Sequence, residues 1–349
     1  MRILFCVNWA VDQFDKPDTC RFRADYVTPT EPYWFFRHLR DQHTVDVIDC
    51  RGPLGLHRLE RGALRCYPYQ SVKTLFREHR YDVVFLHGAQ SGLVLSLICS
   101  LLGRSQPPHF LIDVGAINGG SSNSIASMSC RFVFQSLAGL IYHTSGQERH
   151  YRAHFPKLLD RSRFIPLGVD ASEFTPLKLP LDDQIISIGY AKRDWDTLLR
   201  AYETLHTDTR LVLLGMPRPK DQLPKGVITV PRVNIAEMRQ WVARSRFVVL
   251  PISEIQYSVG QQTLLQSMAL EKTVVASDIS ALRDYATDTI TASFYRPGDA
   301  RDLANRMAYL LSHPDEAAGI GQRARQHIVN EFSESLMAHR IMEFVSRAA

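Results

Sequence analysis

A turn between two apolar segments carries residue types that bind phosphate. Residues 246–250 (RFVVL) form a short apolar run that a proline ends, which is typical of a buried parallel strand. Ser258, Gly260 and Gln261 then form a polar turn before a helix predicted over residues 263–270. A glycine-containing turn at the start of a helix offers free backbone N–H groups and the positive end of the helix dipole to an anion. The alternative is an ordinary strand–helix–strand unit with a glycine turn.

The segment after this turn resembles a known motif. Residues 264–285 read LLQSMALEKTVVASDISALRDY. They resemble the donor-site block of retaining GT-B glycosyltransferases, glycosyltransferase family 4, which usually contains Glu-Ala-Met-Ala-x-Gly-Lys-Pro-Val-Val-Ala-Ser-Asp. The matching positions are Met268, Ala269, Lys272 and residues 274–278.

Four positions depart from the family pattern. The two carboxylates of the family's paired-Glu motif fall on Ser258 and Gln266, the usual glycine falls on Glu271, and the usual proline falls on Thr273. Some branches of the family carry a Gly-Gln turn and an uncharged residue here. We therefore interpret this segment as a variant of the donor site.

The resemblance implies that the second half of the chain binds a nucleotide-sugar. Lys192 and Arg193 follow a predicted strand and Gly189, and such a basic pair suits a diphosphate that gains negative charge as it leaves. The alternative is a basic pair on the surface. By family position, residues 232–234 are expected near the base, and Gln266 near the ribose hydroxyls, which an amide can bond. The expected donor-binding set is Gly189, Lys192, Arg193, Arg232, Asn234, Ser258, Gly260, Gln261, Gln262, Thr263 and Gln266.

The resemblance also implies a reaction that needs no strong protein base. In such transferases the leaving phosphate is thought to help deprotonate the acceptor on the same face of the sugar. In the family a histidine often lies beside the reacting sugar, and here that position falls near Asp113. His87 ends a neighbouring predicted strand and is a second catalytic candidate, although a lone histidine is more often structural. Asn118, Gly119 and Gly120 are expected near the pyrophosphate. We expect no metal ion and no cofactor besides the co-substrate.

A long polar segment follows the first predicted strand. Residues 8–32 are rich in Asp and Pro and are too long for a plain connection in a compact domain. Loops after the carboxyl ends of strands line the cleft of open α/β sheets. We therefore expect an acceptor loop or lid here, with Arg21 and Arg23 as candidate contacts. The alternative is a disordered surface loop.

Strands alternate with helices along the whole chain, which predicts an α/β fold with parallel sheets. The predicted strands are residues 2–7, 44–48, 81–86, 110–112, 139–143, 164–167, 184–188, 210–214, 227–230, 246–250 and 272–276. The segment IPLGVDASEFTP resembles the hinge of the family. The resemblance implies the GT-B fold, two Rossmann-like domains that face each other across a cleft. We expect an acceptor domain at residues 1–168, a donor domain at 169–332, and a last helix at 333–349 that crosses back to the first domain.

Composition and charge restrict the environment of the protein. An apolar fraction of 45% and a charged fraction of 22% are ordinary for a globular protein. The six cysteines form no Cys-x-x-Cys pair, which favours a reducing compartment over a disulfide framework or a zinc site. The longest apolar run, residues 92–102, is too short to span a bilayer. We expect a cytoplasmic location.

The net charge of +5 comes from the first half of the chain. Residues 51–80 contain seven basic residues against Glu60 and Glu78. This pattern indicates either a solvated Arg-rich face or a surface for anionic lipid or an acidic acceptor, with a peripheral position on the inner face of the membrane. Nucleic acid is disfavoured because no recognition motif accompanies the charge.

These observations favour a retaining glycosyltransferase. We expect a hexosyltransferase that moves a sugar from a UDP- or GDP-sugar to a hydroxyl of a glycan, lipid or small molecule, with a lipid-linked saccharide or envelope glycan as the expected acceptor. The second hypothesis is a non-catalytic GT-B module that binds a nucleotide or glycan and supports a partner enzyme, because two carboxylates are missing. A sugar-nucleotide epimerase or a phosphorylase is a weaker alternative. A dehydrogenase is disfavoured because no Gly-x-Gly-x-x-Gly follows the first strand.

Overall fold

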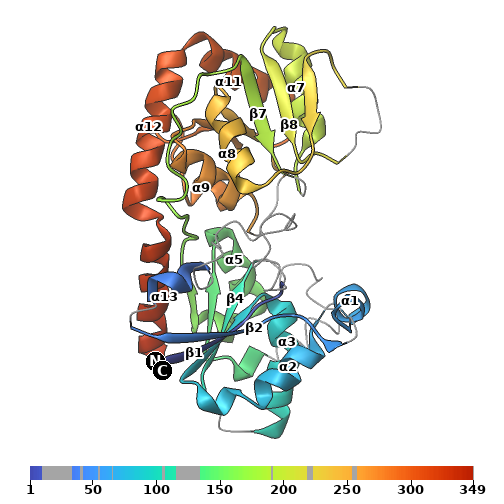
Figure 1. Cartoon of the computed structure of the whole chain (residues 1–349), viewed down its shortest axis with the longest axis vertical. Helices are drawn as coiled ribbons and strands as arrows, with labels where there is room; N and C mark the ends of the chain where they lie inside the picture. The colour runs from blue at the N-terminus through green and yellow to red at the C-terminus, as the bar shows by residue number, and fades with distance from the viewer. Residues whose placement is uncertain are drawn as a thin grey trace. The chain divides into compact units, whose positions relative to one another are not determined.

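The chain forms two compact units, each built on a parallel six-stranded sheet with flanking helices (Figure 1). The first unit comprises Met1–Pro166 and Met337–Ala349, and the second comprises Leu167–Leu336. From the sequence we expected the boundary after residue 168 and the last segment from residue 333. The structure, a computed structural model, describes residues 1–9, 34–39, 42–53, 56–64, 66–103, 107–114, 134–189, 192–217, 223–253 and 258–348. Among these residues, no helix combines the length and the apolar character that crossing a membrane requires.

The sheet of the first unit has the strand order β2-β1-β3-β4-β5-β6. Its central strands are buried at every position and mostly apolar, as expected for a parallel sheet that is covered on both faces. The strands are β1 (Arg2–Cys6), β2 (Thr44–Ile48), β3 (Val83–His87), β4 (His109–Asp113), β5 (Gly139–Tyr142) and β6 (Ser162–Phe164).

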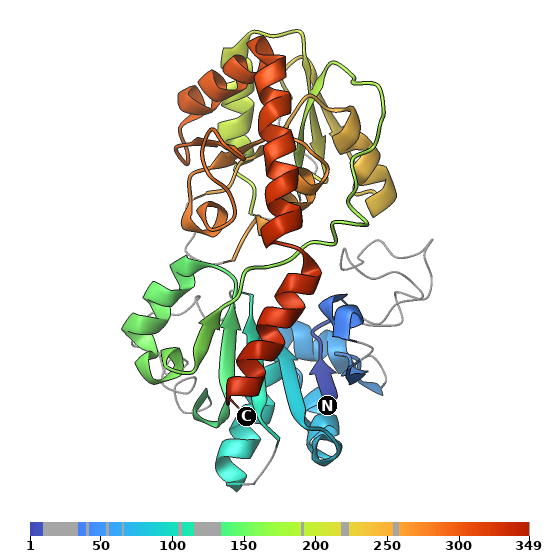
Figure 2. The same ribbon diagram turned by 90° about the vertical axis from the view of Figure 1, so that its left-hand side faces the viewer.

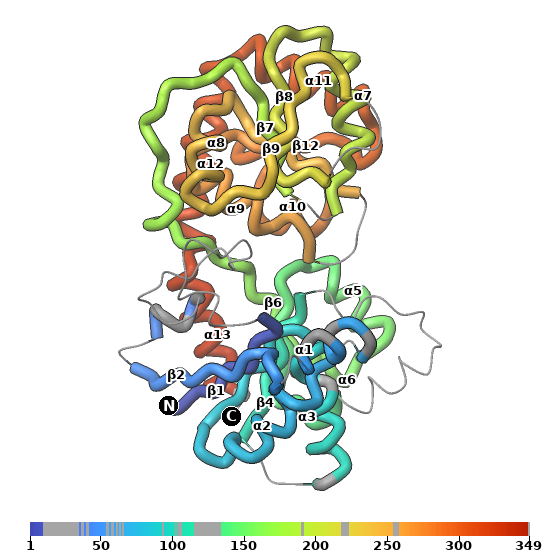
Figure 3. The backbone as a smooth tube through the Cα atoms, turned by 45° about the vertical axis from the view of Figure 1, so that its right-hand side comes forward, coloured from blue at the N-terminus to red at the C-terminus, as the bar shows by residue number. Residues whose placement is uncertain are grey.

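The helices of the first unit include the end of the chain. The part of α13 that belongs to this unit packs on the sheet (Figure 2). The ring of Phe344 there contacts the ring of Phe110 in β4, with 5.6 Å between the centroids. The helices α1, α2 and α3 lie next to one another (Figures 1 and 3). The elements are α1 (Leu56–Leu59), the π-helical turn η4 (Glu60–Leu64), α2 (Pro68–Leu75), the 3-10 turn η5 (Glu78–Arg80), α3 (Ala89–Leu102), η7 (Phe134–Ser136), α5 (Ser145–His154), α6 (Pro156–Leu159) and α13 (Glu334–Ala348).

The sheet of the second unit has the strand order β12-β11-β10-β7-β8-β9. Its strands are β7 (Gln184–Ile188), β8 (Arg210–Leu214), β9 (Val227–Val230), β10 (Val248–Leu250), β11 (Val274–Ser277) and β12 (Ser293–Tyr295). Its helices are α7 (Trp195–Leu205), α8 (Ile235–Arg244), α9 (Gln261–Ala269), α10 (Ser280–Arg283), α11 (Ala300–Ser312) and α12 (Pro314–Glu331). The expected α/β fold is therefore present in both halves of the chain.

Local sequence explains where the helices of the second unit begin and end. Asp194 and Asp299 cap the first turns of α7 and α11 with their carboxylates, as short acidic side chains favour. Helix α9 ends in a Schellman motif, in which the N–H of Lys272 bonds to the carbonyl of Ser267 and the N–H of Glu271 to that of Met268. Glu271 takes the left-handed conformation of this motif with φ 62°. A glycine, which the family usually has at this position, would adopt this left-handed conformation without strain.

The hinge-like segment also requires a glycine. A Cβ on Gly168 would lie 2.7 Å from the Cα of Glu334, within the second unit. Val169 pairs with Ser333 in an isolated parallel bridge, and its N–H bonds to the carbonyl of Phe332 at 2.9 Å. The segment that resembles the family hinge thus lies against the residues that precede and begin α13.

Some expected elements differ in the structure. The strand expected at residues 164–167 lies earlier, at Ser162–Phe164, because Pro166 has no N–H to continue the ladder. A 3-10 helix covers Trp34–Leu39. Helix α9 begins at Gln261, two residues before the expected start. Strand β12 and helices α1, α2 and α5 were not expected.

Candidate active site

In the second unit, the candidate donor site lies where the order of the strands reverses. Strand β7 comes first in this unit, and β8 lies on one side of it and β10 on the other. Ligands of open parallel sheets bind beyond the carboxyl ends of the strands at such a point. The turn after β7 carries Gly189, Lys192 and Arg193, and the segment after β10 leads to Gly260.

Arg193 joins these two turns. Its Nε donates to the carbonyl of Ile188 at 2.8 Å, and its Nη2 donates to Oγ1 of Thr263 in the first turn of α9 at 2.9 Å. The guanidinium packs directly over Gly189, where a Cβ would lie 2.5 Å from Nε. Gly189 has φ 137°, so both its backbone and its surroundings require glycine. Burial lowers the pKa of Arg193 to about 10, which still leaves the guanidinium charged at neutral pH.

The start of α9 has the features of an anion-binding helix terminus. Gly260 is the N-cap, with a left-handed φ of 79°. As a glycine it has no side chain that could bond to the first N–H groups of the helix. No acidic residue lies in the first turn, whereas Asp194 and Asn234 cap neighbouring helices. The first intrahelical bond runs from Leu264 to the carbonyl of Gly260. The N–H groups of the residues before Leu264 therefore point out of the N-terminus of the helix, where the positive end of the helix dipole also lies.

Two buried amides belong to the same helix. Gln261 is 2% exposed and Gln266 is 5% exposed. Within the part of the chain that the structure describes, the Nε2 atoms of both have no hydrogen-bond partner. A buried amide without a partner costs about 1–3 kcal/mol. Both side chains could therefore bond to the oxygen atoms of a ligand.

The other expected donor residues are less closely joined. Lys192 is exposed and has a left-handed φ of 58°, while Ser258, Gln262 and Thr263 are partly buried. Asn234 is the N-cap of α8: its Oδ1 accepts from the N–H of Glu237 at 2.9 Å. Arg232 and Asn234 follow β9, the edge strand two positions from β7. The structure thus brings together Gly189, Arg193, Gly260 and Thr263 most directly.

In the first unit, three polar residues lie at the carboxyl ends of adjacent strands. His87 ends β3, Asp113 ends β4, and His143 follows β5. His87 is buried beside Trp9, with 4.9 Å between the ring centroids. Burial, helped by the nearby His143, lowers the pKa of His87 to about 3. This histidine is therefore neutral at physiological pH and can share hydrogen bonds as either donor or acceptor.

Asp113 is fully buried and fixes a helix. Its Oδ2 accepts hydrogen bonds from the hydroxyl of Tyr151 and, at 3.0 Å, from Nε2 of Gln147, both on α5. Burial and the adjacent carboxylate raise the pKa of Tyr151, so its hydroxyl keeps its proton. The observed role of Asp113 is to hold α5 against β4.

Sequence reasoning missed His143 and its partners on α5. Nδ1 of His143 donates to the carbonyl of Ile165 at 2.8 Å, and burial lowers the pKa of this histidine to about 4. Thr144 caps α5 by accepting from the N–H of Gly146. The run Thr144-Ser145-Gly146 directly after an apolar strand was the available signal, because it marks another strand-to-helix turn at the same edge.

Five of the expected residues lie outside the described residues. They are Asn118, Gly119 and Gly120 near the expected pyrophosphate site, and Arg21 and Arg23 in the expected acceptor loop.

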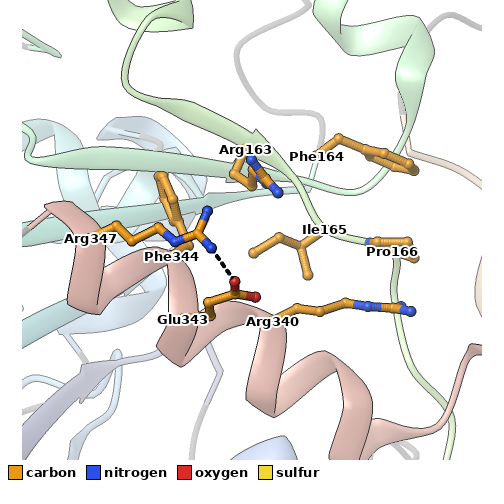
Figure 4. A pocket seen from close by; sticks show the side chains of 8 residues that line it. All are labelled: Arg163, Phe164, Ile165, Pro166, Arg340, Glu343, Phe344 and Arg347. Atoms are coloured by element: carbon orange, nitrogen blue, oxygen red, sulfur yellow. Dashed lines mark hydrogen bonds and ion pairs between the residues drawn. The ribbon is translucent and has the colours of Figure 1, made fainter.

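Two further groups of side chains in the first unit were not expected. A groove of about 270 Å³ lies between the end of β6 and α13, and Glu343 pairs there with Arg347 (Figure 4). Arg163 and Arg340 also line it. The second group is Glu78, Cys99 and His109, whose possible metal-ligand atoms lie within 4.8 Å of one another. His109 and Glu78 share a hydrogen bond of 3.0 Å, which pairs these two buried groups without an ion.

The part of the chain that contains the candidate donor site matches a known protein family. Residues 183–313 match the family described as "Glycosyl transferases group 1". This range runs from β7 to the end of α11, so it includes both turns that Arg193 joins. The comparison with curated proteins finds no match.

Solved structures share the fold over nearly the whole chain. Sucrose-phosphate synthase from Thermosynechococcus elongatus is 15% identical, with a TM-score of 0.73 over 99% of this chain and 98% of that chain. HepE from Anabaena, in complex with UDP, is 14% identical, with a TM-score of 0.70 over 99% of this chain and 100% of that chain. TarM from S. aureus, in complex with UDP and alpha-GlcNAc-glycerol, is 14% identical, with a TM-score of 0.58 over 75% of this chain and 55% of that chain. The expected GT-B fold is confirmed.

Proposed function

We propose that this chain, which has the GT-B fold and matches the group 1 glycosyltransferases in its second unit, is a retaining hexosyltransferase. In this proposal it transfers a sugar from a UDP- or GDP-sugar to a hydroxyl group. The HepE and TarM structures are complexes with UDP, and another HepE structure is a complex with UDP-glucose. A UDP-sugar is therefore the first donor to test.

The observation that carries the proposal is the joining of Arg193 to the start of α9. The bond to Thr263 places a charged guanidinium beside an uncapped helix N-terminus at the switch point of the sheet. An anion there would meet backbone N–H groups, the helix dipole and a charge-assisted donor together. A nucleoside diphosphate is the ligand class that this combination suits best.

The same groups would assist the departure of the sugar. Negative charge grows on the leaving diphosphate in the transition state, so fixed positive groups near it lower the barrier. Arg193, exposed Lys192 and the α9 terminus supply this charge in our proposal, and no metal ion is invoked. Gln266, with its unpaired Nε2, is our candidate for the ribose hydroxyls.

In our proposal the first unit binds the acceptor. The leaving phosphate would take the acceptor proton in a retaining reaction, so the protein needs a positioning group more than a strong base. Neutral His87 suits that role better than Asp113, because Oδ2 of Asp113 already accepts two hydrogen bonds. We propose a lipid-linked saccharide or envelope glycan as the acceptor, reached from the cytoplasmic face of a membrane.

The experiment is a calorimetric titration with UDP-, GDP-, ADP- and TDP-sugars, followed by an assay of the product anomer. Micromolar binding of one donor and a product with the anomeric configuration of that donor would support the proposal. An inverted product would overturn the retaining mechanism. Donor binding without transfer to any glycan or lipid acceptor would favour the alternative of a non-catalytic module, which the missing carboxylates at Ser258 and Gln266 motivate.

A further inference from the structure

Helix α2 buries three polar side chains and exposes several apolar ones. Gln70, Ser71 and Thr74 are each 1% exposed. Nε2 of Gln70 donates to the carbonyls of Val7 and Ile48 at 2.8 and 2.9 Å, while the two hydroxyls bond to carbonyls within the helix. A helix at the surface of a globular protein normally shows the opposite pattern.

The outer face of α2 carries an apolar stripe. Tyr69, Val72 and Phe76 are exposed, and Phe76 is 74% exposed. Their spacing of three and then four residues places them on one side of the helix. Exposing such side chains to water is unfavourable, whereas burying them against an apolar phase stabilises the contact.

The apolar surface extends to the neighbouring helices. Leu56 and Tyr69 both lie against Gly52, where a Cβ would meet them at 3.1 and 3.4 Å. Leu101 on α3 is 69% exposed, and α3 packs beside α2 (Figure 3). Among the described residues, eight of the fifteen exposed large apolar side chains lie between residues 56 and 101 of the first unit. They are Leu56, Leu59, Leu64, Tyr69, Val72, Phe76, Leu97 and Leu101.

The exposed charged side chains that the structure describes between residues 51 and 80 are basic. Lys73, Arg77 and Arg80 follow the apolar stripe at helical spacing, and both arginines are exposed. The two carboxylates of residues 51–80 are buried instead. Oε1 of Glu60 accepts from the N–H of Tyr69 at 2.9 Å, and Glu78 bonds to His109 at 3.0 Å. Outward charge in this segment is therefore basic only.

We propose that the surface of α1, α2 and α3 rests on an anionic lipid membrane. Apolar side chains at the acyl boundary with basic side chains at the headgroups are the combination that binds such an interface. The apolar stripe disfavours a fully solvated face, and the absence of outward carboxylates between residues 51 and 80 in the described part of the chain disfavours a basic partner. The inference deepens the membrane part of the proposed function, but vesicle binding itself requires no donor and no transfer.

The test is flotation of the full-length protein with vesicles of phosphatidylcholine, with or without about one third phosphatidylglycerol. We expect binding to the anionic vesicles at about 0.05 M salt, with weaker binding at about 0.5 M salt. Lys73→Gln with Arg77→Gln should weaken binding by about fivefold for each charge. Val72→Ser with Phe76→Ser should weaken vesicle binding by roughly tenfold or more. This variant should also lose the binding that the wild type retains at high salt.

Matched controls lie in the second unit. Leu181→Ser with Ile290→Ser removes two exposed apolar side chains, and Arg200→Gln with Arg210→Gln removes two exposed charges. Both control proteins should bind as the wild type does. Thermal melting and UDP binding of every variant would separate misfolding, or a failure of the donor site, from a loss of membrane contact.

Three results would overturn the inference. One is no flotation of the folded wild type with anionic vesicles at low salt. Another is equal flotation of the wild type and the α2 variants. A third is a dimer in light scattering that Val72→Ser with Phe76→Ser dissociates, because the apolar stripe would then be covered by a second copy of the chain.

Discussion

Nη2 of Arg193 donates to Oγ1 of Thr263 over 2.9 Å, and this bond connects two turns that are 70 residues apart in the chain. The same guanidinium donates to the carbonyl of Ile188 at the end of β7. Arg193 is therefore held in one orientation at the start of α9. The proposed phosphate site depends on this orientation, because a guanidinium binds phosphate best in a fixed geometry.

Removing the hydroxyl of Thr263 should weaken nucleotide binding. Thr263→Val keeps the shape of the side chain but deletes the acceptor, so Arg193 loses the hydrogen bond that connects it to α9. We expect UDP affinity to fall by about 2- to 12-fold, which corresponds to one ordinary hydrogen bond. Thr263→Ser retains the hydroxyl and should restore the affinity. Equal weakening by both variants, measured by calorimetry, would show that the hydroxyl does not position Arg193.

Glycine at position 271 should stabilise the second unit relative to alanine. Glu271 has φ 62° in the Schellman motif after α9, which is costly for any residue with a Cβ. Glu271→Gly and Glu271→Ala both remove the carboxylate, but only glycine also removes the strain. We expect the glycine variant to have the larger free energy of unfolding by about 1 kcal/mol. Denaturant unfolding tests this, and an alanine variant as stable as the glycine variant contradicts it.

The protein should lose stability as the pH falls from 7 to 5. Burial lowers the pKa of His87 to about 3 and that of His143 to about 4, whereas both are near 6.5 in an unfolded chain. The unfolded state then binds more protons below pH 6.5, and stability decreases until the folded-state pKa is reached. Each histidine should contribute a loss of about 2 kcal/mol at pH 5.

A variant without His143 should show a weaker pH dependence. We expect His143→Gln to lose less unfolding free energy than the wild type between pH 7 and pH 5, whatever its stability at pH 7. His79→Gln changes an exposed histidine and serves as the control. If the wild type and His143→Gln showed the same pH slope, these buried histidines would not determine acid stability.

The sequence predicts the second unit better than the first, for reasons that particular residues make clear. The strands at Gln184–Ile188, Arg210–Leu214 and Val227–Val230 have the predicted bounds, because turn residues mark their ends. Gly260 also marks the start of α9 closely. The contact between Arg193 and Thr263 was beyond prediction, since side-chain bonds between distant turns depend on the packing of the whole sheet.

Helix α2 shows why parts of the first unit were missed. Its core-facing residues include Gln70 and Thr74, and its outer face carries Phe76, so the usual apolar periodicity is reversed. The interior accepts these polar side chains only because they bond to carbonyls of Val7, of β2 and of the helix itself. In the second unit, β12 was missed because it is short and follows a turn rich in threonine, so it has little signal of its own.

The most direct test of the central claim is the affinity of the folded protein for UDP with and without the proposed phosphate contacts. We expect micromolar binding by the wild type, and a loss of about 10- to 150-fold in Arg193→Gln, as for a charge-assisted hydrogen bond. Arg210→Gln removes the same charge at the amino end of β8 and should bind as the wild type does. Unchanged UDP affinity in a folded Arg193→Gln protein would contradict the account.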